Sequence, residues 1–299
     1  MAVSYETDWS TVYDAEQARS YFNEGFADES IPLLDLVFSR PTSTGKETMT
    51  GLSGTTLFSE RAAGSTDDFE ELPFKEGYSK SAVIVDYLAG FTFSSGDWAD
   101  LPEYLKAHAV KQLGAAGPKT INLAIANWIA GMGTTSTGAD TKAIGANDHP
   151  VKHAGGTQDN LTTSAYSDSV YNTIRIAMQG MVDDHGNLDP QDIYAIVFSP
   201  TLAKTMYEVH ASEKYGNTNT LNFAHQGAML RENPWMTDSN DYRILPKPSP
   251  NGPAVLLMRK SPDFVADYDK KSRAAFMNSE MRLVVTGARY LGAYVGEVP

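Results

Sequence analysis

The chain of 299 residues has no cysteine, few basic residues and no apolar run long enough to cross a membrane. The absence of cysteine excludes disulfides, thiolate catalysis and cysteine-ligated metal sites. Its 24 Lys and Arg residues stand against 37 Asp and Glu residues, which gives a formal net charge of −13. This excess argues against a basic nucleic-acid-binding face, because neutralising phosphates requires clustered cations. The segment Met1–Tyr5 does not begin a signal peptide, so we expect a product of the cytoplasm that contacts no membrane.

The sequence also lacks the motifs on which common catalytic and cofactor sites are built. Neither Gly45-Lys46 nor Gly131-x-Gly133 has the further glycines of a phosphate-binding loop or a dinucleotide site, and no G-x-S-x-G hydrolase elbow is present. His149 and His153 lie among prolines and glycines, so we interpret them as loop histidines rather than metal ligands. Residues 183–189 have a glycine at the wrong offset for a calcium loop and favour a turn. We therefore predict no catalytic, cofactor-binding or metal-binding residues, and no enzyme.

The most regular segment runs from Ser164 to Ser212 and predicts a helix, a turn, a strand and a second helix. The first helix is predicted by apolar residues at three- and four-residue spacing: Tyr166, Val170, Ile174, Met178 and Met181. Gly186 suits the left-handed backbone of the turn that follows. The uncharged residues 193–198 predict a strand covered on both faces, and Ser199-Pro200 predicts the start of the next helix. This segment is the core of an α/β domain.

The part of the chain before this core predicts an arm, a hairpin, a strand and a long helix. Residues 1–40 allow one short amphipathic helix, from about Ser10 to Glu24. Residues 42–80 are rich in glycine and predict a long two-stranded excursion. Its few apolar side chains should stay exposed unless a neighbouring subunit covers them: Met49, Leu52, Leu57 and Phe58. Alternating apolar residues from Val83 to Phe93 predict a strand.

The long helix is expected after Asp97, which we interpret as its N-cap, and should run to Met132. Gly117-Pro118 predicts a kink or a break in it, because proline removes a backbone hydrogen bond and crowds the preceding turn. After the α/β core, residues 213–235 predict a polar loop. Four strands are then expected, at 242–245, 254–259, 281–286 and 290–295.

This order of parts resembles the major capsid (head) protein of tailed bacteriophages, which has the Hong Kong 97 fold. Residues 51–77 resemble its extended loop and residues 97–132 its spine helix. The run Asp148-His149-Pro150, Gly155-Gly156-Thr157, Asn160-Leu161-Thr162 is similar to the "HP…GGT…NL" passage of phage Mu-like head proteins. Further segments resemble their "D-x-x-G-N" turn with the next strand, their asparagine-rich loop and their returning strands: 183–202, 217–223 and 281–285. The order and spacing of these motifs, rather than any single one, carry the resemblance.

The resemblance implies an α+β fold in five parts: an N-terminal arm (1–40), an extended loop (41–80), a peripheral domain with the spine helix (81–144), an axial α/β domain (145–250) and strands returning to the peripheral domain (251–299). It implies a structural virion protein that assembles into pentamers and hexamers of an icosahedral head enclosing double-stranded DNA. The implied partners are other copies of the chain, scaffolding, portal and decoration proteins, and the packaged DNA, which is contacted weakly. One relative cross-links a loop lysine, but Lys46 and Lys75 are equally explained as surface lysines.

Two alternatives stay open. An encapsulin-like compartment that loads a protein cargo would share the implied fold. A soluble α/β hydrolase is supported by the α/β core alone, and a fold does not give a function.

Overall fold

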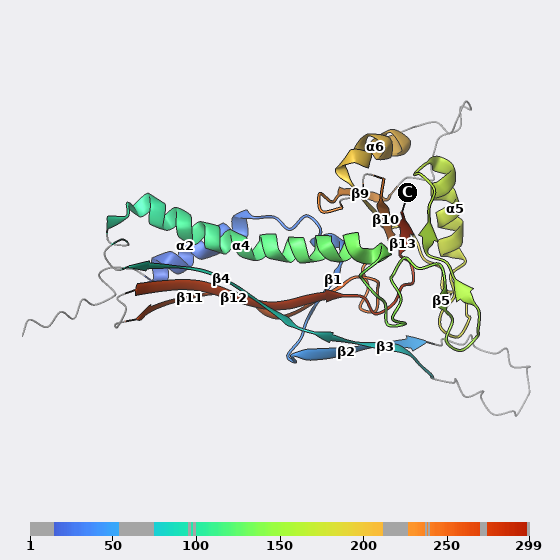
Figure 1. Cartoon of the computed structure of the whole chain (residues 1–299), viewed down its shortest axis with the longest axis horizontal. Helices are drawn as coiled ribbons and strands as arrows, with labels where there is room; N and C mark the ends of the chain where they lie inside the picture. Colours follow the sequence, from blue (N-terminus) through green and yellow to red (C-terminus); the bar gives the residue numbers. More distant parts are fainter. Residues whose placement is uncertain are drawn as a thin grey trace, which may run out of the picture.

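The computed structural model describes residues 15–53, 75–94, 97, 100–211, 227–236, 238, 240–269 and 274–297. In this part of the chain, two helices lie along one face of a long sheet, and a second sheet with its own helices stands at one end (Figure 1). Several sequence predictions fall outside the described residues: the helix start at Ser10, the side chains of Leu52, Leu57 and Phe58, and the loop 217–223.

The long sheet has the strand order β1-β11-β12-β4. Its strands are β1 (Phe38–Pro41), β4 (Val85–Ser94), β11 (Val255–Asp269) and β12 (Ala274–Thr286). β12 pairs antiparallel with both β11 and β4, and β1 joins β11 in parallel. The strand predicted from Val83 to Phe93 is confirmed as β4 from Val85 onward, whereas Val83 ends the preceding strand, β3 (Lys75–Val83). β11 and β12 are longer than the predicted strands, and their added parts contribute the buried side chains of Phe264 and Met277, which pack against the two helices.

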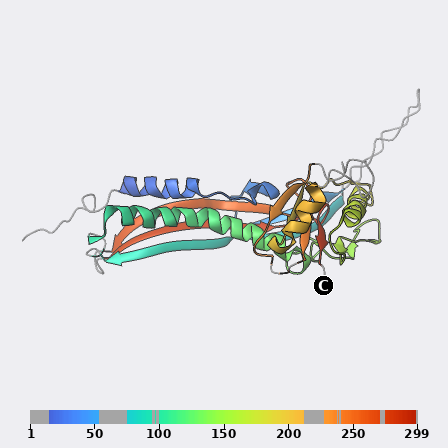
Figure 2. The ribbon, with the colours of Figure 1, turned by 90° about the horizontal axis from the view of Figure 1, so that it is seen from above.

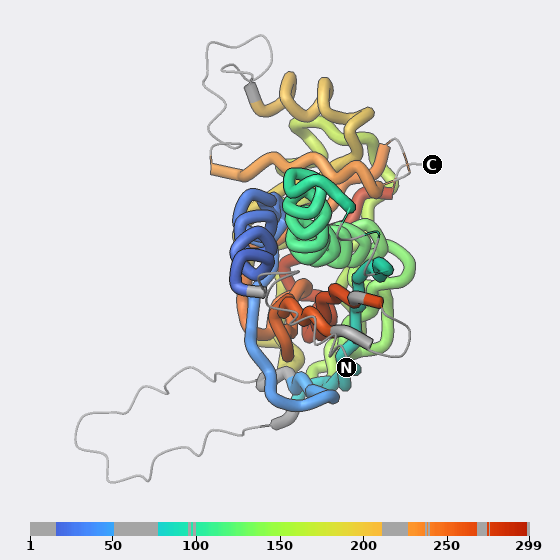
Figure 3. The backbone as a smooth tube through the Cα atoms, turned by 90° about the vertical axis from the view of Figure 1, so that its left-hand side faces the viewer, coloured from blue at the N-terminus to red at the C-terminus, as the bar shows by residue number. Residues whose placement is uncertain are grey.

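Helices α2 (Ala15–Asp28) and α4 (Glu103–Ala130) lie side by side against this sheet (Figures 2 and 3). The first confirms the predicted amphipathic helix, although it ends four residues later than expected. The predicted N-cap at Asp97 is wrong for α4, which begins after Pro102. The carbonyl of Asp97 instead accepts the Leu101 N–H in the turn before the helix. None of the described helices has the length and apolar character of a membrane span.

Of the kink or break predicted at Gly117-Pro118, the break is absent, because α4 is continuous through its 28 residues. Its neighbours approach it closely at two glycines. A Cβ at Gly114 would lie 2.1 Å from the Phe22 carbonyl oxygen, so the backbones of α2 and α4 touch there. A Cβ at Gly117 would lie 2.9 Å from Pro262 of β11. The helix can approach α2 and β11 this closely only because these positions are glycines, and at a rise of 1.5 Å per residue it spans roughly 42 Å.

The second sheet has the order β7-β13-β10-β8-β9. Its strands are β7 (Leu161–Thr162), β8 (Ala195–Phe198), β9 (Met229–Glu232), β10 (Tyr242–Leu245) and β13 (Tyr294–Gly296). Helices α5 (Asp168–Gln179) and α6 (Ala203–Ala211) accompany it. β13 pairs with β10 and β7, so the expectation that residues 251–299 all return to the long sheet is wrong for this last strand.

The predicted helix, turn, strand and helix are confirmed in this region. Ser167 caps α5 by accepting the Val170 N–H, and Gly186 has a positive φ of 84° in the turn. All four residues of β8 are buried, as a strand covered on both faces requires. The Ser199 side chain accepts the Thr201 N–H at the short helix η3 (Pro200–Leu202), which leads into α6. Side chains of α4, α5, β8, β10 and β12 join in one apolar core, so both sheets share it.

The predicted two-stranded excursion is present as an antiparallel pair, β2 (Lys46–Ser53) and β3 (Lys75–Val83). The expectation that its apolar side chains stay exposed is wrong for Met49, which is 3% exposed. Met49 packs with Ala82 of β3 and with residues of the C-terminal half: Val255, Leu257 and Ala288. The base of the hairpin is therefore part of its own subunit's core. Shorter elements are η1 (Leu34–Leu36), η2 (Gly131–Gly133), β5 (His149–Pro150) and β6 (Thr157–Gln158).

Candidate assembly surfaces

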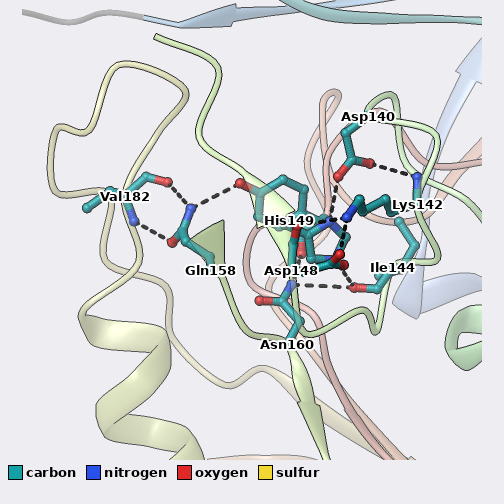
Figure 4. A network of polar contacts seen from close by, with 9 residues as sticks. Asp140, Lys142, Ile144, Asp148, His149, Gln158, Asn160 and Val182 are labelled. Carbon is teal, nitrogen blue, oxygen red and sulfur yellow. Dashed lines mark hydrogen bonds and ion pairs between the residues drawn. The ribbon is translucent and has the colours of Figure 1, made fainter. Parts of the chain in front are cut away.

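The motif residues around His149 form a buried polar network (Figure 4). The His149 ring is fully buried, with Nδ1 2.6 Å from Asp140 Oδ2 and Nε2 2.9 Å from the Ile144 carbonyl oxygen. Its ring stacks on Tyr290 with 3.8 Å between centroids. Because both ring nitrogens face acceptor oxygens, the Asp140–His149 pair holds a proton in each of these hydrogen bonds. His149 is thus a structural residue of the core rather than a surface-loop histidine.

Two amides extend this network to the backbone of Tyr290 and Val182. Asn160 Nδ2 donates to the Tyr290 carbonyl oxygen at 3.0 Å, and the side chain of Gln158 exchanges two hydrogen bonds with the backbone of Val182. Gly155 and Gly156, both with positive φ, make the turn between β5 and β6. The "HP…GGT…NL" residues therefore hold a long loop in place, which sequence reasoning did not reveal because their partners come from distant segments.

Two lysines attach the base of the β2–β3 hairpin to the rest of the subunit. Lys80 of β3 bonds to Thr137 and lies 5.0 Å from the centre of the Trp128 ring, and burial lowers the pKa of Lys80. From the other side, Lys152 Nζ donates to the Gly77 carbonyl oxygen at 2.8 Å and lies 5.0 Å from the Tyr78 ring. These contacts fix the direction in which the hairpin leaves the subunit (Figure 1).

Comparison with known proteins finds similar solved structures, but no family model and no curated protein sequence matches the chain. The capsid of the cyanophage P-SCSP1u is similar with a TM-score of 0.57 and 14% identity, over 91% of this chain and 89% of that one. The capsid of an empty GTA particle has a TM-score of 0.57 and 12% identity, over 90% and 89%. A virus-like particle from Pyrococcus furiosus has a TM-score of 0.54 and 11% identity, over 94% and 98%.

The chain has the Hong Kong 97-like capsid fold. This confirms the α+β fold class expected from the sequence. The Hong Kong 97-like fold explains why a subunit of this size combines one long helix, a projecting hairpin and two sheets of different shape. At these identities the likeness extends to the fold alone.

The face of the long sheet turned away from the helices carries exposed apolar side chains. Along β12, Met277 packs toward α2 and α4, so its neighbour Phe276 points to the opposite face. Phe276 is 37% exposed there, and Leu88 of β4 is 75% exposed. These exposed apolar side chains are candidates for contact with another molecule.

An ion network crosses the same face. Lys260 Nζ lies 3.0 Å from Glu280 Oε2, Arg282 Nε lies 2.6 Å from Glu280 Oε1, and Arg282 also pairs with Asp86. The hydrogen bonds from Lys260 and Arg282 hold the pKa of Glu280 below its usual value. The network links β11, β12 and β4 where the pairing of β11 and β12 is irregular.

The remaining candidate positions have structural roles. Burial would raise the pKa of Asp183, but hydrogen bonds from the backbone N–H groups of Asn187 and His185 outweigh it and hold that pKa below its usual range. The Asp183 carboxylate thus accepts hydrogen bonds within its own turn. His153 stacks on His185, and within the described ranges no three His, Asp or Glu side chains converge on a possible metal position. Lys46 is exposed, and the side chain of Lys75 lies outside the described residues.

Proposed function

We propose that this chain is a major capsid protein, a structural protein whose copies assemble into the pentamers and hexamers of an icosahedral head around double-stranded DNA. The observation that carries the proposal is the similarity to capsid structures over about nine-tenths of both chains. The exposed apolar side chains on the long sheet and the β2–β3 hairpin support it, because both offer surface for neighbouring copies.

In this proposal the functional residues are surfaces and no residue is catalytic. The arm (1–40) and the extended loop (41–80) reach neighbouring copies, residues 81–144 with β11 and β12 form the peripheral domain, and residues 145–250 with β13 form the axial domain. The protein assembles in the host cytoplasm and resides in the virion, with scaffolding, portal and decoration proteins as further partners. The packaged DNA is held weakly, because the subunit carries a formal net charge of −13.

Negative-stain electron microscopy of the purified protein, together with sedimentation, tests this function. We expect closed shells or rings of capsomers. A compact monomer at every protein and salt concentration would contradict the proposal and would return the soluble α/β hydrolase to consideration.

An encapsulin-like compartment is the second candidate, because one matched structure is a virus-like particle from Pyrococcus furiosus. Nuclease-treated particles from cells that produce the complete virus separate the two. Protected double-stranded DNA supports the capsid, whereas a stoichiometric protein cargo with no DNA supports the compartment.

A further inference from the structure

A pocket of about 500 Å³ lies where the C-terminal end of α4 meets the second sheet. Part of its lining is apolar and part is acidic: Leu161, Trp235 and Met236, and Asp238, Asp241 and Glu297. Arg243 is the one basic residue among the described residues that line it. The lining therefore has an excess of negative charge beside an apolar wall.

The four Nη hydrogens of the Arg243 head group are already used inside the protein, whereas its Nε is buried without a hydrogen-bond partner. Arg243 is 2% exposed, and its Nη1 donates to the carbonyl oxygens of Tyr242 and Gly296 at 3.1 and 2.9 Å. Its Nη2 donates to the Ala130 carbonyl oxygen at 3.1 Å and to Asp241 Oδ2 at 2.8 Å. With two hydrogens on each Nη, all four are assigned, so Arg243 has no Nη donor left for a second carboxylate.

Two carboxylates of the pocket consequently keep acceptor capacity. Glu297 Oε1 lies 3.7 Å from Arg243 Nη2, an ion-pair distance that is too long for a hydrogen bond. Asp241 is 8% exposed, and its Oδ1 is buried without a hydrogen-bond partner. The Glu297 side chain can lie in this position because residue 133 is a glycine: a Cβ on residue 133 would lie 1.5 Å from Glu297 Oε1. A buried acceptor that lacks a hydrogen-bond donor favours a ligand that donates a hydrogen bond to it.

The aromatic and apolar lining of the pocket also suits a cation on a hydrocarbon stem. Trp235 is 40% exposed at the pocket and can lie against a positive group. The apolar wall suits a hydrocarbon stem that ends in the charge, as in Lys and Arg side chains.

We propose that this pocket receives a Lys or Arg side chain from a second copy of the chain. The inference rests on the proposed function, in which copies assemble. Subunits with a formal net charge of −13 repel one another, and a basic side chain placed in a neighbour's acidic pocket offsets that repulsion. A metal ion fits less well, since no three acidic or histidine side chains in the described ranges converge on a metal position.

Glu297→Gln tests this pocket, with Glu103→Gln as a matched control. Both changes remove one negative charge, and Glu103 lies at the far end of α4 with a 64% exposed side chain. Neither should change the melting temperature of the unassembled protein by more than about 1 °C. Glu297→Gln should raise the protein concentration needed for assembly roughly tenfold over that of Glu103→Gln, since one partner of a partly desolvated charge pair is lost.

The salt dependence separates an electrostatic contact from a purely structural role of Glu297. Between about 0.05 and about 0.5 M NaCl the Debye length falls from roughly 14 to roughly 4 Å. The ratio of the two variants' assembly concentrations should therefore shrink as salt rises. A ratio that stays constant with salt, or one near unity throughout, overturns the proposal.

A small polyamine is the competing occupant, and spermidine titrated into the unassembled protein probes it. Spermidine binding that is lost in Glu297→Gln while assembly stays unchanged overturns the proposal. Failure of the unaltered protein to form any particle contradicts the proposed function itself, so the two failures are distinguishable.

Discussion

The substitution His149→Ala should destabilise the subunit strongly, because it leaves the carboxylate of Asp140 buried without its partner. The side chains of His149 and Asp140 are 0% and 1% exposed, and 2.6 Å separates their hydrogen-bonded atoms. Among the described residues, the other hydrogen bond to this carboxylate comes from the Lys142 N–H at 3.4 Å. Removing one partner of a buried pair costs about 3–5 kcal/mol, and the lost bond to Ile144 and the lost stacking on Tyr290 act in the same direction.

This free energy converts to a measurable shift of the melting temperature. At about 2.1 cal/mol/K per residue, unfolding of a 299-residue chain has an entropy of roughly 0.6 kcal/mol/K. A loss of about 4 kcal/mol then lowers the melting temperature by roughly 6–7 °C. Scanning calorimetry of the unassembled protein is the assay.

His153→Ala is the matched control, because His153 lies on the same loop and is exposed. It should change stability by no more than about 0.5 kcal/mol, or roughly 1 °C. The double variant Asp140→Ala, His149→Ala should be less destabilised than the sum of the two single variants, since it leaves no orphaned charge. Equal melting temperatures for His149→Ala and His153→Ala, or an additive double variant, would refute the reasoning.

Four further predictions concern other parts of the chain. Replacing residues 54–74 by a short Gly-Ser linker should leave circular dichroism melting unchanged but prevent full-sized shells in electron microscopy; the linker has to start after Met49, because that side chain belongs to the core. Gly114→Val should lower the melting temperature by forcing α2 away from α4, whereas the exposed control Leu123→Val should change it little. Glu280→Gln should lower the melting temperature at neutral pH. The difference from the unaltered protein should shrink as the pH falls below the ordinary glutamate pKa of 4.5 and should vanish below the lower pKa of the folded state, because the Glu280 carboxylate is then protonated in both the folded and the unfolded protein. The isolated protein should bind duplex DNA weakly at about 0.15 M salt, and submicromolar affinity with a steep salt dependence in a filter-binding assay would contradict this.

The segments that could be predicted from the sequence are those whose structure depends on neighbours along the chain. The stripe of α5, the uncharged run of β8 and the turn at Gly186 are set by local spacing and backbone freedom, and each is found where expected. The order of parts also led to the correct fold class.

The sequence predictions were wrong where the structure of a segment depends on contacts with residues far away along the chain. Met49 is buried by Val255 and Leu257, which lie at the other end of the chain. Pro118 lies within a continuous helix whose nearby glycines, Gly114 and Gly117, are approached closely by α2 and β11. The pocket was likewise invisible in the sequence, since α4, β7, β10 and the residue after β13 each contribute to it and no local motif marks it.

The contacts at the C-terminal end of α4 imply that the two sheets move as one body. Carbonyl groups in the last turns of a helix lack full intrahelical partners and need others. In α4 the carbonyl oxygens of Ala126, Trp128 and Ala130 accept hydrogen bonds from three side chains outside the helix: Asn233, Ser136 and Arg243. The first and last of these donors belong to the region of the second sheet.

A rotation of the second sheet against α4 would break these bonds together. Each buried group left unpaired costs about 1–3 kcal/mol, and the shared apolar core would open as well. Such a hinge is therefore costly. In the shell proposed above, we expect differences in curvature between rings of copies to be taken up between subunits rather than within this body.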